Sequence, residues 1–546
     1  MSMFGDYKSY KKFAPQYTEW KSKRDLQEAK RIKYLQEKPN AVKQADIQKS
    51  KAILRAIDVM DEYSQRKAEN AEVATESVIS FGLQIAMTLG MGLTFLLTKL
   101  KSVKNLISKY AKNDKKIAGM LTIASTVTGG LLSTVAAIPL YAWAAKAEVK
   151  ASRRGRFEAM KKELSDSKTF AVLDEEQEKQ LAQNLKALKP QKEEKELFKG
   201  LKESWEAVKG LAVDSKSYIN QRLEFEADLA KDKKHFNKEL TSNEIENAKK
   251  DQQLLTKLIE KIDIASQDYA ENAELATSAV MSTVFGLGAL FTLCYEKIAK
   301  LLKLKTTAVP AYLSMGAMLF SSIFAAQIQK QAARVGRFKV KQELLKNPEQ
   351  LVYVADEKTA EIKDVQINLQ KKTGMFKFLK EAWKNNKEFE KWKKTQGAEE
   401  KKLSKAMENI ELSEEQLKDA KRLQHNTFKT FNKIDENSQK YSESIEALGQ
   451  AIQYPLSLIF SGIGIALGVK HLTKIKNPKN TAEMTMPLIK YISTVFLATL
   501  PSIGINAYIT KEQKKASRVA NMLAINELQD YRNFVDYSRL KNNDKF

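Results

Sequence analysis

One acidic phrase occurs three times in this chain of 546 residues, each time directly before a long stretch without charge. The copies read MDEYSQRKAENAEVAT (Met60–Thr75), IDIASQDYAENAELAT (Ile262–Thr277) and IDENSQKYSESIEALG (Ile434–Gly449). A basic phrase follows each uncharged region: KASRRGRF (Lys150–Phe157), QAARVGRF (Gln331–Phe338) and KASRVANM (Lys515–Met522). Self-similarity of this kind is typical of an internal repeat, and it predicts that the chain consists of three similar structural units.

Further landmarks extend the repeat on both sides. An aromatic stretch with the same Phe-to-Trp spacing precedes each acidic phrase, at Phe13–Trp20, Phe198–Trp205 and Phe376–Trp383. An apolar position follows each basic phrase, at Phe170, Leu351 and Phe534. We therefore predict three tandem units that cover residues 1–190, 191–371 and 372–546.

The composition favours helices throughout. Charged residues make up 29% of the chain, only ten residues are proline, and no run alternates apolar and polar residues as a strand would. Lys-rich and Glu-rich stretches with apolar residues at three- and four-residue spacing predict long amphipathic or coiled helices between the uncharged regions. We expect an all-α protein.

Six segments without charge have about the length that a helix needs to cross a bilayer, roughly 20 residues. They are Val78–Thr98, Ile117–Ala145, Leu275–Tyr295, Thr306–Ala326, Ala447–Val469 and Tyr491–Ile509. Their many Gly, Ala, Ser and Thr residues also suit a buried hairpin in a soluble bundle. The lack of charge on any face favours membrane insertion instead. We expect an integral, multi-pass membrane protein with six transmembrane helices in three hairpins, at about 78–145, 275–326 and 447–509.

Each two-helix hairpin leaves and re-enters on one side of the membrane, so the three units are parallel rather than inverted. The acidic and basic phrases of one unit then lie on the same side, where they continue the hairpin as a charged stalk. We expect the long charged regions to be cytoplasmic, because the chain starts with a polar stretch rather than a secretory signal.

Charged residues at helical spacing form stripes in both phrases. The acidic stripe comprises Asp61, Glu69 and Glu72, then Asp263, Glu271 and Glu274, then Asp435, Glu443 and Glu446. The basic stripe comprises Lys150, Arg153, Arg156, Arg334, Arg337, Lys515 and Arg518. We expect ion pairs between the two arms of each hairpin, with Glu72 near Arg153, that fix the register of the helices. Contact of the basic stripe with anionic lipid headgroups is an alternative, and cation binding at the acidic stripe is another.

Lys and Arg outnumber Asp and Glu by 92 to 67, which gives a formal charge of +25 and favours anionic partners. Membrane lipids with anionic headgroups and partner proteins fit the pattern. Nucleic acid fits poorly, because the positive charge is spread along helices without interleaved aromatic residues.

The chain lacks the motifs of catalysis. The three histidines lie far apart in sequence, Cys294 is the single cysteine, and no phosphate loop, nucleophile elbow or dinucleotide fingerprint is present. We expect no enzyme activity, no catalytic residues, no metal site and no cofactor. The sequence does not determine the oligomeric state.

These patterns lead to a hypothesis for function. We expect a multi-pass membrane scaffold or tether, built from three parallel hairpin repeats, whose basic helices contact anionic lipid or partner proteins. The alternative is a pore or transporter formed by a pseudo-threefold ring of the three hairpins.

Overall fold

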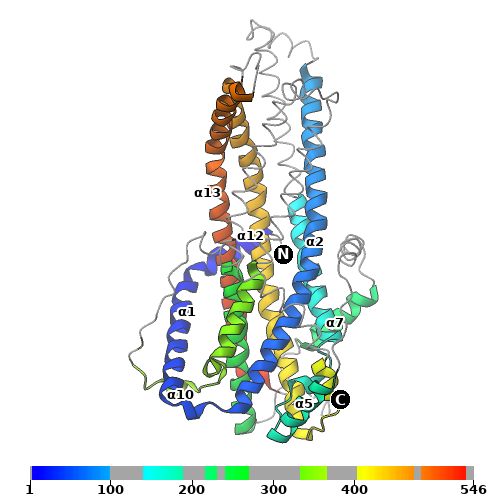
Figure 1. Ribbon diagram of the computed structural model, residues 1–546, viewed down its shortest axis with the longest axis vertical. Coiled ribbons are helices and arrows are strands. Elements are labelled where there is room, and N and C mark those ends of the chain that lie inside the picture. Colours follow the sequence, from blue (N-terminus) through cyan, green and yellow to red (C-terminus); the bar gives the residue numbers. More distant parts are fainter. Residues whose placement is uncertain are drawn as a thin grey trace.

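The computed structural model is an elongated bundle of helices (Figure 1). It describes residues 3–98, 139–188, 216–229, 240–269, 273, 332–363, 365, 402–472 and 481–535. Every regular element in these residues is a helix, and none of them lies in a strand. The all-α fold is confirmed.

Seven long helices build the described part of the bundle. Four are α1 (Met3–Glu37), α2 (Gln44–Thr98), α12 (Glu414–Leu472) and α13 (Thr481–Glu527). The other three cover residues 139–162, 242–269 and 332–346. In Figure 1, α2, α12 and α13 run along the long axis and extend well beyond the broader lower end, where α1 packs along the side.

Short helices connect and cover the long ones at the lower end. They are η1 (Pro39–Ala41), η2 (Ser167–Phe170), α5 (Glu175–Ala187), α7 (Lys216–Leu229), η4 (Pro348–Leu351), α10 (Asp356–Thr359), η5 (Tyr531–Phe534) and a turn of helix at 402–408. The start of α5 shows how sequence sets these boundaries. Asp174 accepts hydrogen bonds from the backbone N–H groups of Glu176 and Gln177, and the Gln177 side chain accepts one from the Asp174 N–H in return.

The largest apolar core of the described residues draws on the residues before each acidic phrase and after each basic phrase. Met60, Ile262 and Ile434, the first residue of each phrase, are all buried in it. Phe170, Leu351 and Phe534 reach the same core from η2, η4 and η5. Burial of each such side chain contributes about 1.5–3 kcal/mol, so this core holds parts of all three predicted units together. The division into repeats remains a prediction.

The expectation of a multi-pass membrane protein is wrong. Among the residues that the structure describes, no helix is long and apolar enough to cross a membrane. The sequence argument selected segments by their lack of charge, whereas insertion depends on apolarity, and small or hydroxyl-bearing residues dilute these runs. Stretches of Gly, Ala, Ser and Thr pack equally well against neighbouring helices. The cytoplasmic placement of the charged regions followed from that topology and is withdrawn with it.

Several expected segments lie outside the described residues. They are Leu275–Tyr295, Thr306–Ala326, the first part of Ile117–Ala145 and the aromatic stretches Phe198–Trp205 and Phe376–Trp383. The remaining uncharged segments belong to described helices: Val78–Thr98 to α2, Ala447–Val469 to α12 and Tyr491–Ile509 to α13.

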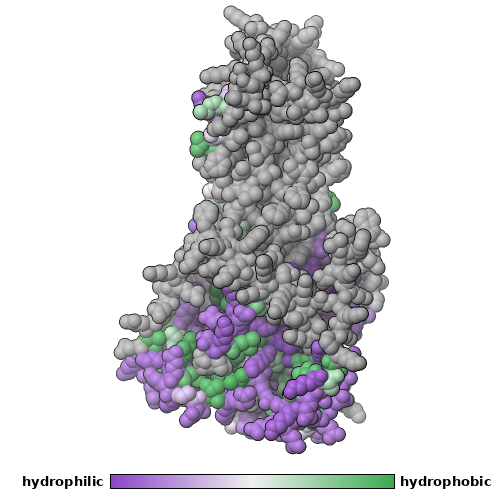
Figure 2. Space-filling model, in the orientation of Figure 1, coloured by the Kyte–Doolittle hydropathy of each residue, from purple (hydrophilic) through white to green (hydrophobic). Residues whose placement is uncertain are grey.

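The described surface of the lower end is mainly hydrophilic, with small apolar patches between charged side chains (Figure 2). This end carries α5 and α10 (Figure 1).

Candidate functional site

Six of the long helices contact one another in a closed order, through polar side chains at five of the contacts and through close approach at Gly336 between helix 242–269 and helix 332–346. Starting from α2, the order is helix 139–162, α12, α13, helix 242–269, helix 332–346 and then α2 again. Helices that carry an acidic phrase alternate with helices that carry a basic phrase. Each helix therefore has two neighbours of the opposite kind, one from its own predicted unit and one from another unit.

Close contact joins the two helices of the same unit. The hydroxyl oxygens of Ser64 and Ser152 lie 2.5 Å apart, and Ser438 contacts Ser517 at the matching positions of α12 and α13. A Cβ atom added to Gly155 would lie 2.8 Å from the Cα of Ser64, closer than real Cβ contacts allow. Glycine is needed here because the two backbones touch.

The first acidic residue of each phrase contacts a different unit. Asp61 of α2 pairs with Arg337 of helix 332–346, and their N–O distance is 2.5 Å. Asp435 of α12 pairs with Arg156 of helix 139–162. Asp263 accepts a hydrogen bond from the side-chain amide of Asn521 in α13. Unit 1 therefore contacts unit 2, unit 2 contacts unit 3, and unit 3 contacts unit 1.

Neighbouring positions in the phrases repeat this cyclic order. Three arginines make the ion pairs: Arg334 with Glu62 at 3.4 Å, Arg518 with Asp268 at 2.8 Å, and Arg153 with Glu436. The glutamine of each phrase also reaches the next unit, as Gln65 to Arg334, Gln267 to Ser517 and Gln439 to Ser152. We name this set of contacts the polar ring.

The polar ring differs from the ladder that we expected within each hairpin. Arg153, expected near Glu72, pairs with Glu436 of another unit. The arms of the first hairpin also pair directly, between Lys67 and Glu158 at 3.4 Å. Sequence reasoning treated one hairpin at a time, so it found the charged stripes but did not predict contacts between hairpins.

Burial controls the charge states in the polar ring. It raises the pKa of Asp61 above the usual range, and nearby Arg337 opposes this shift. It also lowers the pKa of Arg337, against the effect of Asp61. Each removal of a charge from water is costly, so a buried pair of this kind fixes geometry more than it adds stability.

One of the three matching contacts in the polar ring lacks an arginine. Arg156 and Arg337 face Asp435 and Asp61, but the matching residue opposite Asp263 is Asn521, which carries no charge. Burial, with Asp61 nearby, raises the pKa of Asp263 to about 6, although the hydrogen bond from Asn521 opposes the change. Asp263 is therefore the acidic residue of the ring whose carboxyl is protonated as pH falls below about 6.

The other residues of the predicted acidic and basic stripes lie outside the polar ring. Burial and the neighbouring Glu446 raise the pKa of Glu443 well above its usual range. Glu446 itself accepts a hydrogen bond from Gln513 at 2.7 Å. Lys150 lines a cavity, Lys515 is exposed, and Glu72 lies in the described part of α2. The side chains of Glu69, Glu271 and Glu274 lie outside the described part of the chain.

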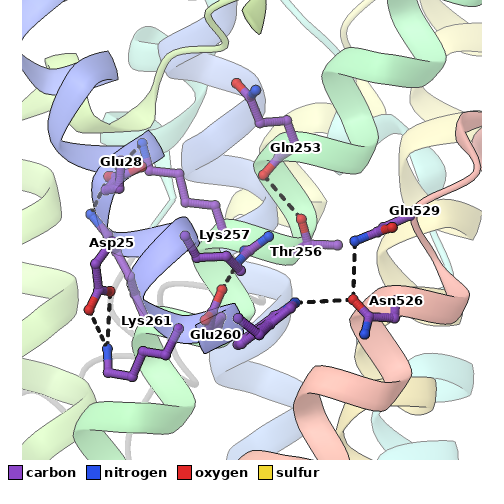
Figure 3. A network of polar contacts seen from close by, with 12 residues as sticks. Asp25, Glu28, Gln253, Thr256, Lys257, Glu260, Lys261, Asn526 and Gln529 are labelled. Carbon is purple, nitrogen blue, oxygen red and sulfur yellow. Dashed lines mark hydrogen bonds and ion pairs between the residues drawn. The ribbon is translucent and has the colours of Figure 1, made fainter. Parts of the chain in front are cut away.

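A second polar network, which the sequence did not predict, attaches α1 to the bundle (Figure 3). Glu28 of α1 pairs with Lys257 at 3.0 Å and Lys261 at 2.8 Å, both on helix 242–269. The indole N–H of Trp20 donates to Asn526 of α13 at 3.0 Å. The Phe-to-Trp landmark was a usable signal here, because Trp20 is its last residue.

The effects of burial on Glu28 and Lys257 differ. The two lysines lower the pKa of Glu28 to about 2, although burial acts in the opposite direction. Burial lowers the pKa of Lys257 to about 8 despite Glu28, and only 5% of its side chain is exposed. Glu28 is thus compensated by two cations, and burial is the largest single influence on the pKa of both Glu28 and Lys257.

Comparison with known proteins gives no further assignment: no family model, curated protein or solved structure matches this chain. Among the described side chains, no group of three or more His, Cys, Asp or Glu residues could hold a metal ion. The polar ring and the elements around it are therefore interpreted from their own geometry.

Proposed function

We propose that this protein is a non-catalytic helical scaffold or tether, in which the polar ring locks three units into one rigid body. Basic helices of this body contact anionic lipid headgroups or partner proteins. The observation that supports the proposal is the closed order of contacts from unit 1 to unit 2, to unit 3 and back to unit 1. In a closed ring, separation of any unit breaks two interfaces at once.

The chemistry of the polar ring also suits a scaffold. Buried ion pairs add little net stability, but they can specify register and partner choice between helices. Asp61 with Arg337, and Asp435 with Arg156, each exclude arrangements that would leave a buried charge alone. A protein whose task is to hold a fixed geometry benefits from this specificity.

A pore or transporter is not proposed. That alternative requires helices that cross a membrane, and among the described residues no helix meets the requirement. The excess of Lys and Arg over Asp and Glu, 92 to 67, supports an anionic partner for the scaffold.

Amide hydrogen exchange of the full chain tests the single rigid body. We expect Arg337→Met to speed exchange in all six helices, because opening one interface of a closed ring releases the others. Lys346→Met is the matched control, since Lys346 lies on the same helix 332–346 but is exposed. Faster exchange confined to helix 332–346 and α2 would refute the locked scaffold.

A further inference from the structure

A cavity of about 340 Å³ lies beside the polar ring. Helix 139–162, α12, α7 and the first turn of α1 each contribute residues to its wall. Its volume falls at the lower end of the roughly 300–1,000 Å³ that is typical of small-molecule sites. The space suits a small ligand or the headgroup of a larger one.

Cationic side chains dominate the wall of this cavity. Five of them line it, from three helices: Lys146, Lys150, Arg153, Arg222 and Lys440. The first three share one face of helix 139–162, at spacings of four and three residues. Only two carboxylates line the same space, Asp6 and Glu443. A concave site lined by one sign of charge concentrates ligands of the opposite sign.

The two carboxylates offset only part of this positive charge. Asp6 is buried and already engaged, because it accepts a hydrogen bond from Ser444 at 2.9 Å and lies 3.9 Å from the ammonium of Lys440. Burial and Glu446 raise the pKa of Glu443, which favours its neutral acid form. A neutral acid donates a hydrogen bond to an anion instead of repelling it.

Two polar atoms of the lining residues also lack a hydrogen-bond partner within the described structure. They are Nε of Arg153, a donor, and Oε2 of Glu443, which is a donor when the acid is protonated. Both atoms are buried, and both residues line the cavity. Both atoms have almost no accessible surface, so the accessible ends of the cationic side chains, not these two atoms, present the hydrogen-bond donors to a ligand.

We propose that this cavity binds a phosphate group, carried by a small organic phosphate or by a phospholipid headgroup. Arginine presents donors in a planar fork that matches phosphate oxygens, and several lysines suit its multiple negative charge. Ala142, Ala145 and Val149 form an apolar part of the wall, where the carbon atoms next to the phosphate would lie. This site names a ligand class for the basic helices of the scaffold, and it rests on the proposed function in the contact of helix 139–162 with α12 that both share.

Calorimetric titration of the full chain with glycerol 3-phosphate tests the proposal. We expect saturable binding that Lys150→Gln combined with Lys440→Gln weakens by at least about tenfold, since two charge-assisted contacts are lost. The matched control combines Lys162→Gln with Lys421→Gln, because these lysines are exposed on the same two helices. The control should bind as the unchanged protein does.

A second arm separates the two sources of phosphate. Co-flotation is measured with phosphatidylcholine vesicles, with and without phosphatidic acid. Binding to the phosphatidic acid vesicles alone assigns a lipid headgroup, and binding of glycerol 3-phosphate assigns a soluble ligand. Absence of saturable binding to both probes, or an equal loss in the control, overturns the proposal.

Circular dichroism checks that each variant is folded. If the double variant is not, Lys146→Gln replaces it, because Lys146 lines the cavity but is exposed, and it too must weaken binding. Unchanged binding in Lys146→Gln would then count against the site. The hydrogen-exchange test changes Arg337, which does not line the cavity, and the titration changes Lys150 and Lys440, which are not in the polar ring, so the two proposals fail separately.

Discussion

The ion pair between Asp61 and Arg337 offers the sharpest test of the polar ring. Their atoms lie 2.5 Å apart, and only 14% and 11% of the two side chains are exposed. At that distance, with an effective dielectric constant of about 20, the gross attraction is about 7 kcal/mol, most of which offsets desolvation. Removal of one partner leaves the other charge buried, so Arg337→Met or Asp61→Leu alone should cost about 3–5 kcal/mol.

The double variant should be much less harmful than the sum of the single variants, because it leaves no buried charge. In urea unfolding followed by circular dichroism, we expect a coupling energy of at least about 2 kcal/mol between the two positions. The exposed pair of Lys23 and Glu19, within α1, is the control and should show no measurable coupling. Additive effects at Asp61 and Arg337 would refute the contact between units.

Three further predictions concern glycine packing, pH dependence and the ion pairs of α1. Gly155→Ala should lower stability by about 1–3 kcal/mol, because the added methyl meets the backbone of α2. Gly504 of α13 has open space around it, so Gly504→Ala should raise stability by about 0.5–1 kcal/mol. Thermal unfolding measures both effects. Because the folded pKa of Asp263, about 6, exceeds its ordinary value of 3.8, its contribution to stability is complete below 3.8 and is lost as pH rises through 6. Asp263→Asn should therefore remove about 3 kcal/mol of pH dependence over that range in urea unfolding, and an unchanged profile would contradict the assignment. Glu28→Gln should destabilise the protein by about 3 kcal/mol, because it leaves Lys257 and Lys261 without their carboxylate. Lys257→Met should be neutral or stabilising, because Glu28 keeps Lys261 as a partner. Equal losses of stability in the two variants, measured by urea unfolding, would contradict this difference.

Local patterns in the sequence determine the helices and their charged faces. Helix-forming composition and three- to four-residue spacing predict the all-α fold, which the structure confirms. The first acidic residue of each phrase was also readable as part of a stripe, and Asp61 and Asp435 do make ion pairs there. These features depend on neighbours within a few turns of one helix, so a single chain records them directly.

Only the tertiary structure determines which stripes meet. The spacing around Arg153 and Arg337 is the same whether they pair within one hairpin or with the next unit, because helix periodicity contains no information about the neighbouring helix. In the packed bundle, both arginines pair with a carboxylate of another unit. The same holds for the cavity, whose cations Arg222 and Lys440 are far from Lys150 in sequence. Lack of charge was likewise an insufficient guide to the surroundings of the uncharged segments, because a segment of small residues packs against protein as readily as against lipid.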